Sequence, residues 1–240
     1  MEPRHSGSGE SSVRKYFILS VLAGAFIALG GAAAMAVGGL TGNKLLVAIV
    51  FSSALSLCVM AGSSLFTGEC LKQSLAVMQK KTPTLGVVGL LAFCWIGNLI
   101  GSWAVLIAYQ IAGVSPAAIK YTVGVALAKA AETPAQCFFK AILCNICVCL
   151  AVWCCIKMQS EAGKLIMIFW CIVIFMVCGF EHSVANMSIV GLAVCDGSVS
   201  VLSYVYNLAI VTLGNAVGGI CFVALPYHLV AKGDLSMTTK

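Results

Sequence analysis

Residues Gly179–Met187 read GFEHSVANM and stand at the end of a long apolar run, Leu165–Phe180. Glu181 and His182 are expensive to desolvate at membrane depth, so such side chains usually face a cavity or a substrate path and not lipid. The glycine, serine and asparagine beside them predict that a helix breaks here. A broken helix inside a bilayer is tolerated only where it packs in protein or lines a wet cavity. The segment therefore predicts a transport path through a membrane.

The composition predicts an integral membrane protein. The chain has 240 residues, of which 61% are hydrophobic and 9% charged, and its mean hydropathy is +1.04. Soluble domains carry about 25% charged residues. The net charge of +6 is spread over short loops, so it does not indicate a nucleic-acid partner. We expect the lipid bilayer to surround a single domain over residues 15–232, with tails over 1–14 and 233–240.

The 13 cysteines lie mostly inside apolar runs, where a free thiol behaves as a small hydrophobic group. The Cys-x-Cys pair (Cys147, Cys149) and the Cys-Cys pair (Cys154, Cys155) lack the paired Cys-x-x-Cys spacing of a zinc or redox site. We therefore expect packing thiols, with no metal, no cofactor and no catalytic residue.

Six apolar segments are long enough, or nearly so, to span a bilayer, which needs about 20 residues per helix. They are Tyr16–Gly38, Leu46–Phe66, Leu85–Ala112, Ala135–Ile156, Leu165–Phe180 and Val199–Val223. Six spans place both termini on one side, and the distribution of lysine and arginine predicts that this side is the cytoplasm. The Ala-rich segment Ser115–Glu132 predicts a short helix on the outer surface.

The chain also repeats itself. Gly62 and Gly179 each end an apolar stretch, and the motif Gly-Asn-x-x-Gly occurs at Gly97 and again at Gly214, so both pairs are 117 residues apart. Each half, over residues 15–112 and 133–230, has three spans, and an odd number inserts the halves in opposite orientations. The prediction is an all-α membrane fold of two inverted three-helix repeats in which the second and fifth helices are broken. Paired interruptions of this kind mark substrate paths.

Five polar side chains are candidates for this path. His182 would face the pore as a proton-exchangeable donor, or would be a packed histidine bonded to a carbonyl group. Thr67 would offer a hydroxyl from the other break, or would cap a helix. Lys140 would either snorkel or attract anions by its potential, and Asn145 and Asn207 are amides suited to holding the broken segments.

Four segments of the chain resemble the signature blocks of the formate/nitrite transporter family, in the family's order and spacing. They are LFTGE (Leu65–Glu69), CNICVCLAVW (Cys144–Trp153), FEHSVANM (Phe180–Met187) and NLAIVTLGNAVGG (Asn207–Gly219). The resemblance covers Tyr16 to about Val230. It implies an aquaporin-like homopentamer in the cell membrane, with one pore per protomer for small monovalent anions such as formate, nitrite or hydrosulfide.

The resemblance also implies roles for individual residues. His182 matches the central histidine of the family and Thr67 its loop threonine. The hydrophobic constriction is implied at a further set of positions: Leu55, Leu65, Phe66, Phe51 and Phe175. Glu69 departs from the pattern, since many members have asparagine there, and this leaves the adjoining loop and the substrate open.

Two mechanisms and two other functional classes remain open at this stage. A proton delivered near His182 would let the neutral acid pass the narrowing, or His182 and Thr67 would hydrogen-bond the anion itself. Glu181 would have a structural role, because a carboxylate repels anions. The competing classes are a membrane redox enzyme that uses the Cys-rich spans, and a non-transporting structural or sensor protein.

Overall fold

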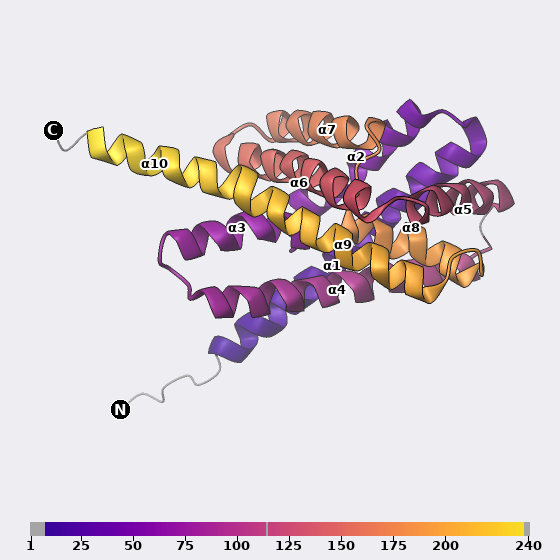
Figure 1. Ribbon diagram of the computed structural model, residues 1–240, viewed down its shortest axis with the longest axis horizontal. Helices are drawn as coiled ribbons and strands as arrows, with labels where there is room; N and C mark the ends of the chain where they lie inside the picture. The colour runs from indigo at the N-terminus through magenta and orange to yellow at the C-terminus, as the bar shows by residue number, and fades with distance from the viewer. Residues whose placement is uncertain (1–7, 114, 238–240) are drawn as a thin grey trace.

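The computed structural model describes residues 8–113 and 115–237, and over these residues every regular element is a helix (Figure 1). The elements are α1 (Ser8–Thr41), α2 (Lys44–Met60), α3 (Phe66–Met78), α4 (Thr84–Ile111), α5 (Pro116–Ala130), α6 (Pro134–Lys157), α7 (Glu161–Val177), α8 (Ser183–Cys195), α9 (Val201–Gly219), the π-helix η1 (Ile220–Ala224) and α10 (Leu225–Met237). The prediction of an all-α fold is confirmed.

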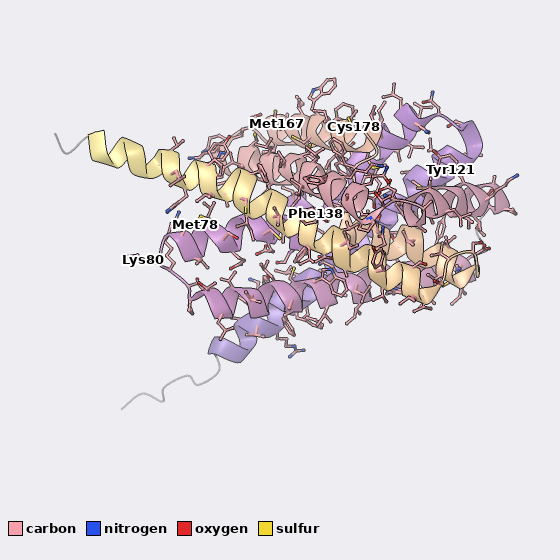
Figure 2. The ribbon with its side chains drawn as sticks, in the orientation of Figure 1. Met78, Lys80, Tyr121, Phe138, Met167 and Cys178 are labelled. Atoms are coloured by element: carbon pink, nitrogen blue, oxygen red, sulfur yellow. The ribbon has the colours of Figure 1, made fainter. Side chains whose placement is uncertain are left out.

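Four helices of the described part of the chain are long and apolar enough to cross a membrane. They cover Ser12–Thr41, Thr84–Ile111, Pro134–Lys157 and Val201–Ala231. The second and fifth predicted spans each correspond to two shorter helices, α2 with α3 and α7 with α8. The start of α1, the turn between α3 and α4 and the end of α10 lie at one end of the molecule (Figure 1). Met78 and Lys80 mark that turn in Figure 2.

The ends of the chain are more helical than the sequence predicts. Residues 8–14 and 233–237, which belong to the two predicted tails, continue α1 and α10. Residues 1–7 and 238–240 of those tails lie outside the described residues. The last predicted span also runs on past Val223, because η1 accommodates one wider turn without ending the helix.

Two short helices, α2 and α7, each end at a glycine with a positive φ angle. In α2, Ser63 N donates to Cys58 O at 2.9 Å and Gly62 N to Val59 O at 3.2 Å, while Gly62 has φ +70°. This is the Schellman motif, which needs a left-handed residue and therefore favours glycine. The end of α7 repeats it around Gly179, with φ +67°.

The offset of 117 residues recurs in the helix bounds. Helix α7 begins and ends 117 residues after α2 (161 and 177 against 44 and 60), and α8 does so after α3 (183 and 195 against 66 and 78). Helix α9 begins 117 residues after α4 (201 against 84). Side-chain caps follow the same rule, since Asn43 caps α2 and Ser160 caps α7. The segments from α2 to the start of α4 and from α7 to the start of α9 therefore fold with the same local bounds.

The Gly-Asn-x-x-Gly motifs form close helix crossings, as predicted. A Cβ atom on Gly101 of α4 would lie 1.9 Å from the carbonyl oxygen of Val21 in α1. A Cβ atom on Gly218 of α9 would lie 2.4 Å from the carbonyl oxygen of Ile142 in α6. Small residues allow membrane helices to approach this closely, so α1 packs on α4 and α6 on α9.

Helix α5 confirms the predicted short helix in Ser115–Glu132, but it does not simply lie on the surface. Ala118, Thr122 and Ala126 are buried on one face, and α5 contacts α1 and α8. The residues are four apart, which is the spacing of one helix face. The Ala-rich pattern therefore provides a small packing face that brings the helix against the centre of the protein.

The tight crossing of α1 and α4 leads to a stability prediction. Gly101→Ala places a methyl group against the backbone of α1, so we expect it to cost about 1–3 kcal/mol through overpacking. Gly89→Ala on the same helix is the control, because a Cβ there meets no atom within 4 Å. Thermal unfolding in detergent should show a lower melting temperature for Gly101→Ala only. Equal melting temperatures would contradict the close crossing.

Candidate substrate path

His182 and Thr67 meet at the centre of the protein. Thr67 Oγ1 lies 3.1 Å from His182 Nε2, and both residues are buried. Thr67 belongs to the first turn of α3 and His182 is the N-cap of α8. The positive ends of two helix dipoles therefore face the same place. The predicted pairing of the two breaks in one region is thus present in the geometry.

The hydrogen bonds of His182 define the tautomer of its ring. Nδ1 accepts a hydrogen bond from Ala185 N at 3.0 Å, so this nitrogen carries no proton. In the neutral ring Nε2 then carries the hydrogen and donates it to Thr67 Oγ1. The Thr67 hydroxyl hydrogen is left to donate to a neighbouring group. Protonation of Nδ1 would break the cap of α8.

The five residues implied for the constriction are all buried, and two of them, Phe51 and Phe175, make ring contacts. The Phe51 and Phe175 rings meet edge to face at 5.9 Å, and Phe175 stacks on the His182 ring at 6.0 Å. Phe51 belongs to α2 and Phe175 to α7. Leu55 lies one turn after Phe51 in α2, and Leu65 and Phe66 begin α3. Helices from both halves thus bring apolar side chains beside the polar pair.

Two cavities approach this apolar layer from opposite sides. The first, about 420 Å³, reaches Phe175 and His182, and we call it the histidine cavity. The second, about 440 Å³, reaches Leu55 and Leu65, and we call it the leucine cavity. Tyr121 of α5 and Cys178 at the end of α7, both labelled in Figure 2, line the histidine cavity. The arrangement is two cavities, one on each side of a short hydrophobic layer that contains the Thr67–His182 pair.

Asn98 and Asn215 hold the broken segments, a role that the sequence analysis did not give them. Asn98 Oδ1 accepts from Phe66 N at 2.9 Å, and its Nδ2 donates to Ser64 O at 3.0 Å. Asn215 Oδ1 accepts from Ser183 N at 2.9 Å, and its Nδ2 donates to Glu181 O at 2.9 Å. Each amide therefore satisfies one donor and one acceptor of the backbone where a helix is interrupted.

The carboxylate of Glu181 is paired inside the histidine cavity. Lys129 Nζ lies 2.5 Å from Glu181 Oε1, and Asn186 Nδ2 donates to Glu181 Oε2 at 2.6 Å. This contact pattern supports the structural role that we expected for Glu181. Lys129 is a functional residue that the sequence analysis missed. The sequence feature that could have pointed to Lys129 is Glu181, because a buried carboxylate needs a positively charged partner.

Lys140 lines the histidine cavity and forms an ion pair with Glu132. The positive charge of Lys140 is therefore balanced by Glu132 at the cavity wall. This ion pair is a third arrangement, besides the snorkelling and the anion attraction that the sequence left open. The positive and negative groups of this region come from α2, α5, the turn between α5 and α6, α6 and the segment before α8. Only folding brings them together, because they are separated in the sequence.

Asn145 and Asn207 lie in the scaffold around the path. Asn145 Nδ2 donates to Asn215 O at 2.6 Å and to Thr67 O at 3.2 Å. Asn207 Oδ1 accepts from Asn186 Nδ2 at 2.8 Å. Neither amide lines the histidine or the leucine cavity. The structure therefore places neither amide beside the two cavities, and Asn145 is the one that bonds the backbone of α3 and of α9.

Glu69 is buried near the start of α3 and forms an ion pair with Lys72. Gln73 Nε2 also donates to Glu69 Oε2 at 2.8 Å. Lys72 in turn lines the leucine cavity. A carboxylate in the first turn of a helix is favoured by the helix dipole, although no side chain caps the first turn of α3 by a hydrogen bond.

Comparison with known proteins places the geometry in context. The family model described as formate/nitrite transporter matches residues 6–229. The nitrite transporter NirC of Salmonella typhimurium is 35% identical over 220 residues, covering 88% of this chain and 81% of that protein. A probable formate transporter of Methanothermobacter thermautotrophicus is 37% identical over 241 residues, covering 89% and 87%.

Solved structures agree with these sequence relatives. An ion channel of the same family superposes with a TM-score of 0.85 at 33% identity, and the match covers 92% of each chain. A pentameric formate channel with formate bound superposes with a TM-score of 0.78 at 25% identity, covering 93% of this chain and 99% of that chain.

The Lys129–Glu181 pair leads to a second prediction. Lys129→Met leaves a buried carboxylate without its cation, which costs about 3–5 kcal/mol, so we expect a large drop in melting temperature. The double variant Lys129→Met, Glu181→Gln should recover most of the loss. Lys164→Met is the control, since its partner Glu161 is 65% exposed and such a pair contributes about 1 kcal/mol or less. Equal losses for the two lysine variants would contradict a buried pair.

Proposed function

The chain belongs to the formate/nitrite transporter family, and from this premise we propose that it is a membrane channel for small monovalent anions of weak acids. Formate, nitrite and hydrosulfide are the candidate substrates. The observation that carries the proposal is the buried Thr67–His182 pair, which lies 3.1 Å apart between two cavities. Because family members are transporters and channels, the chain is a transport protein and not a redox enzyme.

The electrostatics of the path support an anion. Helices α3 and α8 both begin at the pair, and a helix N-terminus favours negative charge. The Lys129–Glu181 and Lys140–Glu132 pairs are neutral overall, so they do not oppose entry. A hydrophobic layer remains, however, and a bare anion crosses it poorly because desolvation of a charge is costly.

The tautomer of His182 favours one of the two mechanisms left open by the sequence. With Nδ1 occupied by Ala185 N, the ring serves as a neutral donor through Nε2 to Thr67. Thr67 then turns its hydroxyl hydrogen toward the substrate. We propose that this donor chain holds the substrate oxygen or sulfur at the barrier, where the neutral acid or the hydrogen-bonded anion passes.

We propose that α2 with α3 and α7 with α8 are two broken membrane helices of an inverted repeat. The shared offset of 117 residues in the helix bounds supports this. So does the hydrogen bond from Trp95 Nε1 to Thr212 Oγ1 at 3.0 Å, which joins residues that are themselves 117 apart. Equivalent residues touch only near the axis that relates the repeats, so this bond lies beside a pseudo-two-fold axis.

The assembly and orientation are proposals of the same kind. The similar formate channel is pentameric, and we propose a homopentamer with one pore in each protomer. Large apolar side chains such as Leu202 and Leu213 are exposed in the single chain, which suits contact with lipid or a neighbouring protomer. We place the protein in the cell membrane with both termini in the cytoplasm.

The function is tested by uptake of formate, nitrite, hydrosulfide and chloride into proteoliposomes at acidic and neutral pH. We expect at least one weak-acid anion to enter faster than chloride. We also expect His182→Phe to change the selectivity or the pH dependence, because the donor at the barrier is lost. Thr67→Val should act in the same direction, and His228→Phe in α10 is the matched control away from the path. Wild-type transport by His182→Phe at both pH values would contradict the role of His182.

The orientation is tested separately by fusing a reporter that is active only in the cytoplasm to the C-terminus. We expect activity, because the excess of lysine and arginine in the loops on that side sets the topology. A second fusion in the loop between α8 and α9, after Gly197, should be inactive. The opposite pair of results would contradict the proposed orientation, with both termini in the cytoplasm.

A further inference from the structure

The histidine cavity continues into a second, more open hollow at the surface of the protein. This hollow has a volume of about 580 Å³, and we call it the glycine hollow because its wall contains Gly38, Gly39, Gly42 and Gly124. Four residues line both spaces, and we call them the neck: Lys44 of α2, with Tyr121, Val125 and Ala128 of α5. The three residues of α5 have the spacing of one helix face. The neck therefore connects the surface with the cavity that reaches His182.

Lys44 differs from the other lysines that line the two cavities. Each of the others forms an ion pair: Lys129 with Glu181 and Lys140 with Glu132 in the histidine cavity, and Lys72 with Glu69 and Lys164 with Glu161 in the leucine cavity. Among the described residues, no carboxylate forms an ion pair with Lys44. Lys44 is also exposed, so its ammonium group is accessible to a solute at the neck.

Tyr121 supplies the second polar group of the neck. Its ring packs directly against α1, because a Cβ atom on Gly38 would lie 2.2 Å from Tyr121 Cε1. Figure 2 labels this residue on α5. The Tyr121 hydroxyl makes no hydrogen bond to the described residues, and it is not one of their buried unpaired atoms. A ring held in place by α1 thus presents an accessible O–H donor at the same neck as the charge of Lys44.

These two groups offer what a small anion requires. An ammonium group has three N–H donors and a phenol has one O–H donor, and hydrogen bonds between charged partners are the stronger ones. Lys44 is the first residue of α2, so the positive end of that helix dipole adds to the potential. The nearby carboxylates, Glu132 and Glu181, are each engaged by another lysine and leave Lys44 available to a solute.

We infer that Lys44 and Tyr121 form a capture site for the ionised substrate, where a small monovalent anion such as formate binds before it reaches the hydrophobic layer. This rests on the proposed function and deepens it, because the charge is bound at one place and the Thr67–His182 pair acts at another. Lys120 lines the glycine hollow but not the histidine cavity, so it lies outside the capture site.

The test compares Lys44→Gln with Lys120→Gln, which remove the same charge inside and outside the neck. Both lysines are exposed, so neither change disturbs a buried contact. At formate concentrations below saturation, we expect Lys44→Gln to lower the initial rate of uptake into proteoliposomes about three- to tenfold, because a positive potential in a cleft raises the local concentration of anions. Lys120→Gln should lower it about twofold at most, because salt screens an exposed charge. At saturating formate both should match the wild type, and Lys44→Arg should retain most of the wild-type rate throughout.

Tyr121→Phe removes the hydroxyl and keeps the ring. We expect it to lower formate uptake below saturation about two- to fivefold, the effect of losing one hydrogen bond. Tyr109→Phe in α4 is the control, since Tyr109 lines neither the histidine cavity nor the glycine hollow. Wild-type uptake by Tyr121→Phe, or an equal loss in Tyr109→Phe, would overturn the assignment of Tyr121.

A chemical test changes the sign of the charge at a single position. Lys44→Cys is prepared in a Cys178→Ser background, because Cys178 also lines the histidine cavity. The purified protein is labelled before reconstitution with a positively or a negatively charged methanethiosulfonate, and each product is compared with the equally labelled Cys178→Ser protein. We expect the positive label to restore formate uptake below saturation and the negative label to lower it further.

Three results would overturn the capture site. The first is an equal loss in Lys44→Gln and Lys120→Gln, which indicates a diffuse surface field. The second is a loss in Lys44→Gln that is as large at saturating formate, which indicates a role in passage through the barrier. The third is equal uptake with the positive and the negative label. Absence of formate, nitrite and hydrosulfide uptake by the wild type contradicts the proposed function instead, so the two failures are distinguishable.

Discussion

The structure depends on satisfying the backbone polar groups in the segments between α2 and α3 and between α7 and α8. No water reaches hydrocarbon, so an unpaired N–H or C=O there costs several kcal/mol. Asn98 and Asn215 meet this demand with one amide each, bonded to Phe66 N and Ser183 N and to the carbonyl groups two residues earlier. Without these bonds the interruptions could not persist, and no polar site could exist at the barrier.

The interruptions then create the chemistry of the path. Because α3 and α8 begin at the centre, their dipoles and first-turn side chains point at a common place. His182 caps α8 through Nδ1. The other nitrogen of the same ring, Nε2, donates to Thr67. This coupling explains why a packed histidine and a functional histidine are not alternatives here. The structural bond to Ala185 prepares the hydrogen that the ring offers to Thr67.

The charged side chains of the histidine cavity follow a different principle from the interruptions. Lys129 and Lys140 are each neutralised by a glutamate, so the cavity has strong local fields but little net charge from these pairs. Burial of such pairs costs desolvation energy that offsets much of the attraction between the two charges, so the pairs are weak evidence for added stability. Asn186 links the Lys129–Glu181 pair to Asn207 of α9, and it is the point where the charged wall meets the cavity beside His182.

The sequence by itself determined the membrane environment, the all-helical class and the positions of the two interruptions. These depend on local properties, namely apolar length, glycine at helix ends and the repeated motifs. It also predicted His182 and Thr67 as path residues, since polar groups beside a break are rare in a membrane, and the two side chains lie 3.1 Å apart. Only the tertiary structure decided that Lys129 pairs with Glu181, that Lys140 is balanced by Glu132 and that Asn98 and Asn215 support the breaks. Lys129 and Glu181 are far apart in the chain and leave no local pattern, because burial of a charge requires a counter-charge but does not say which helix supplies it. Glu132 and Lys140 are close in the chain, but the sequence alone does not show that the turn between α5 and α6 brings them into contact.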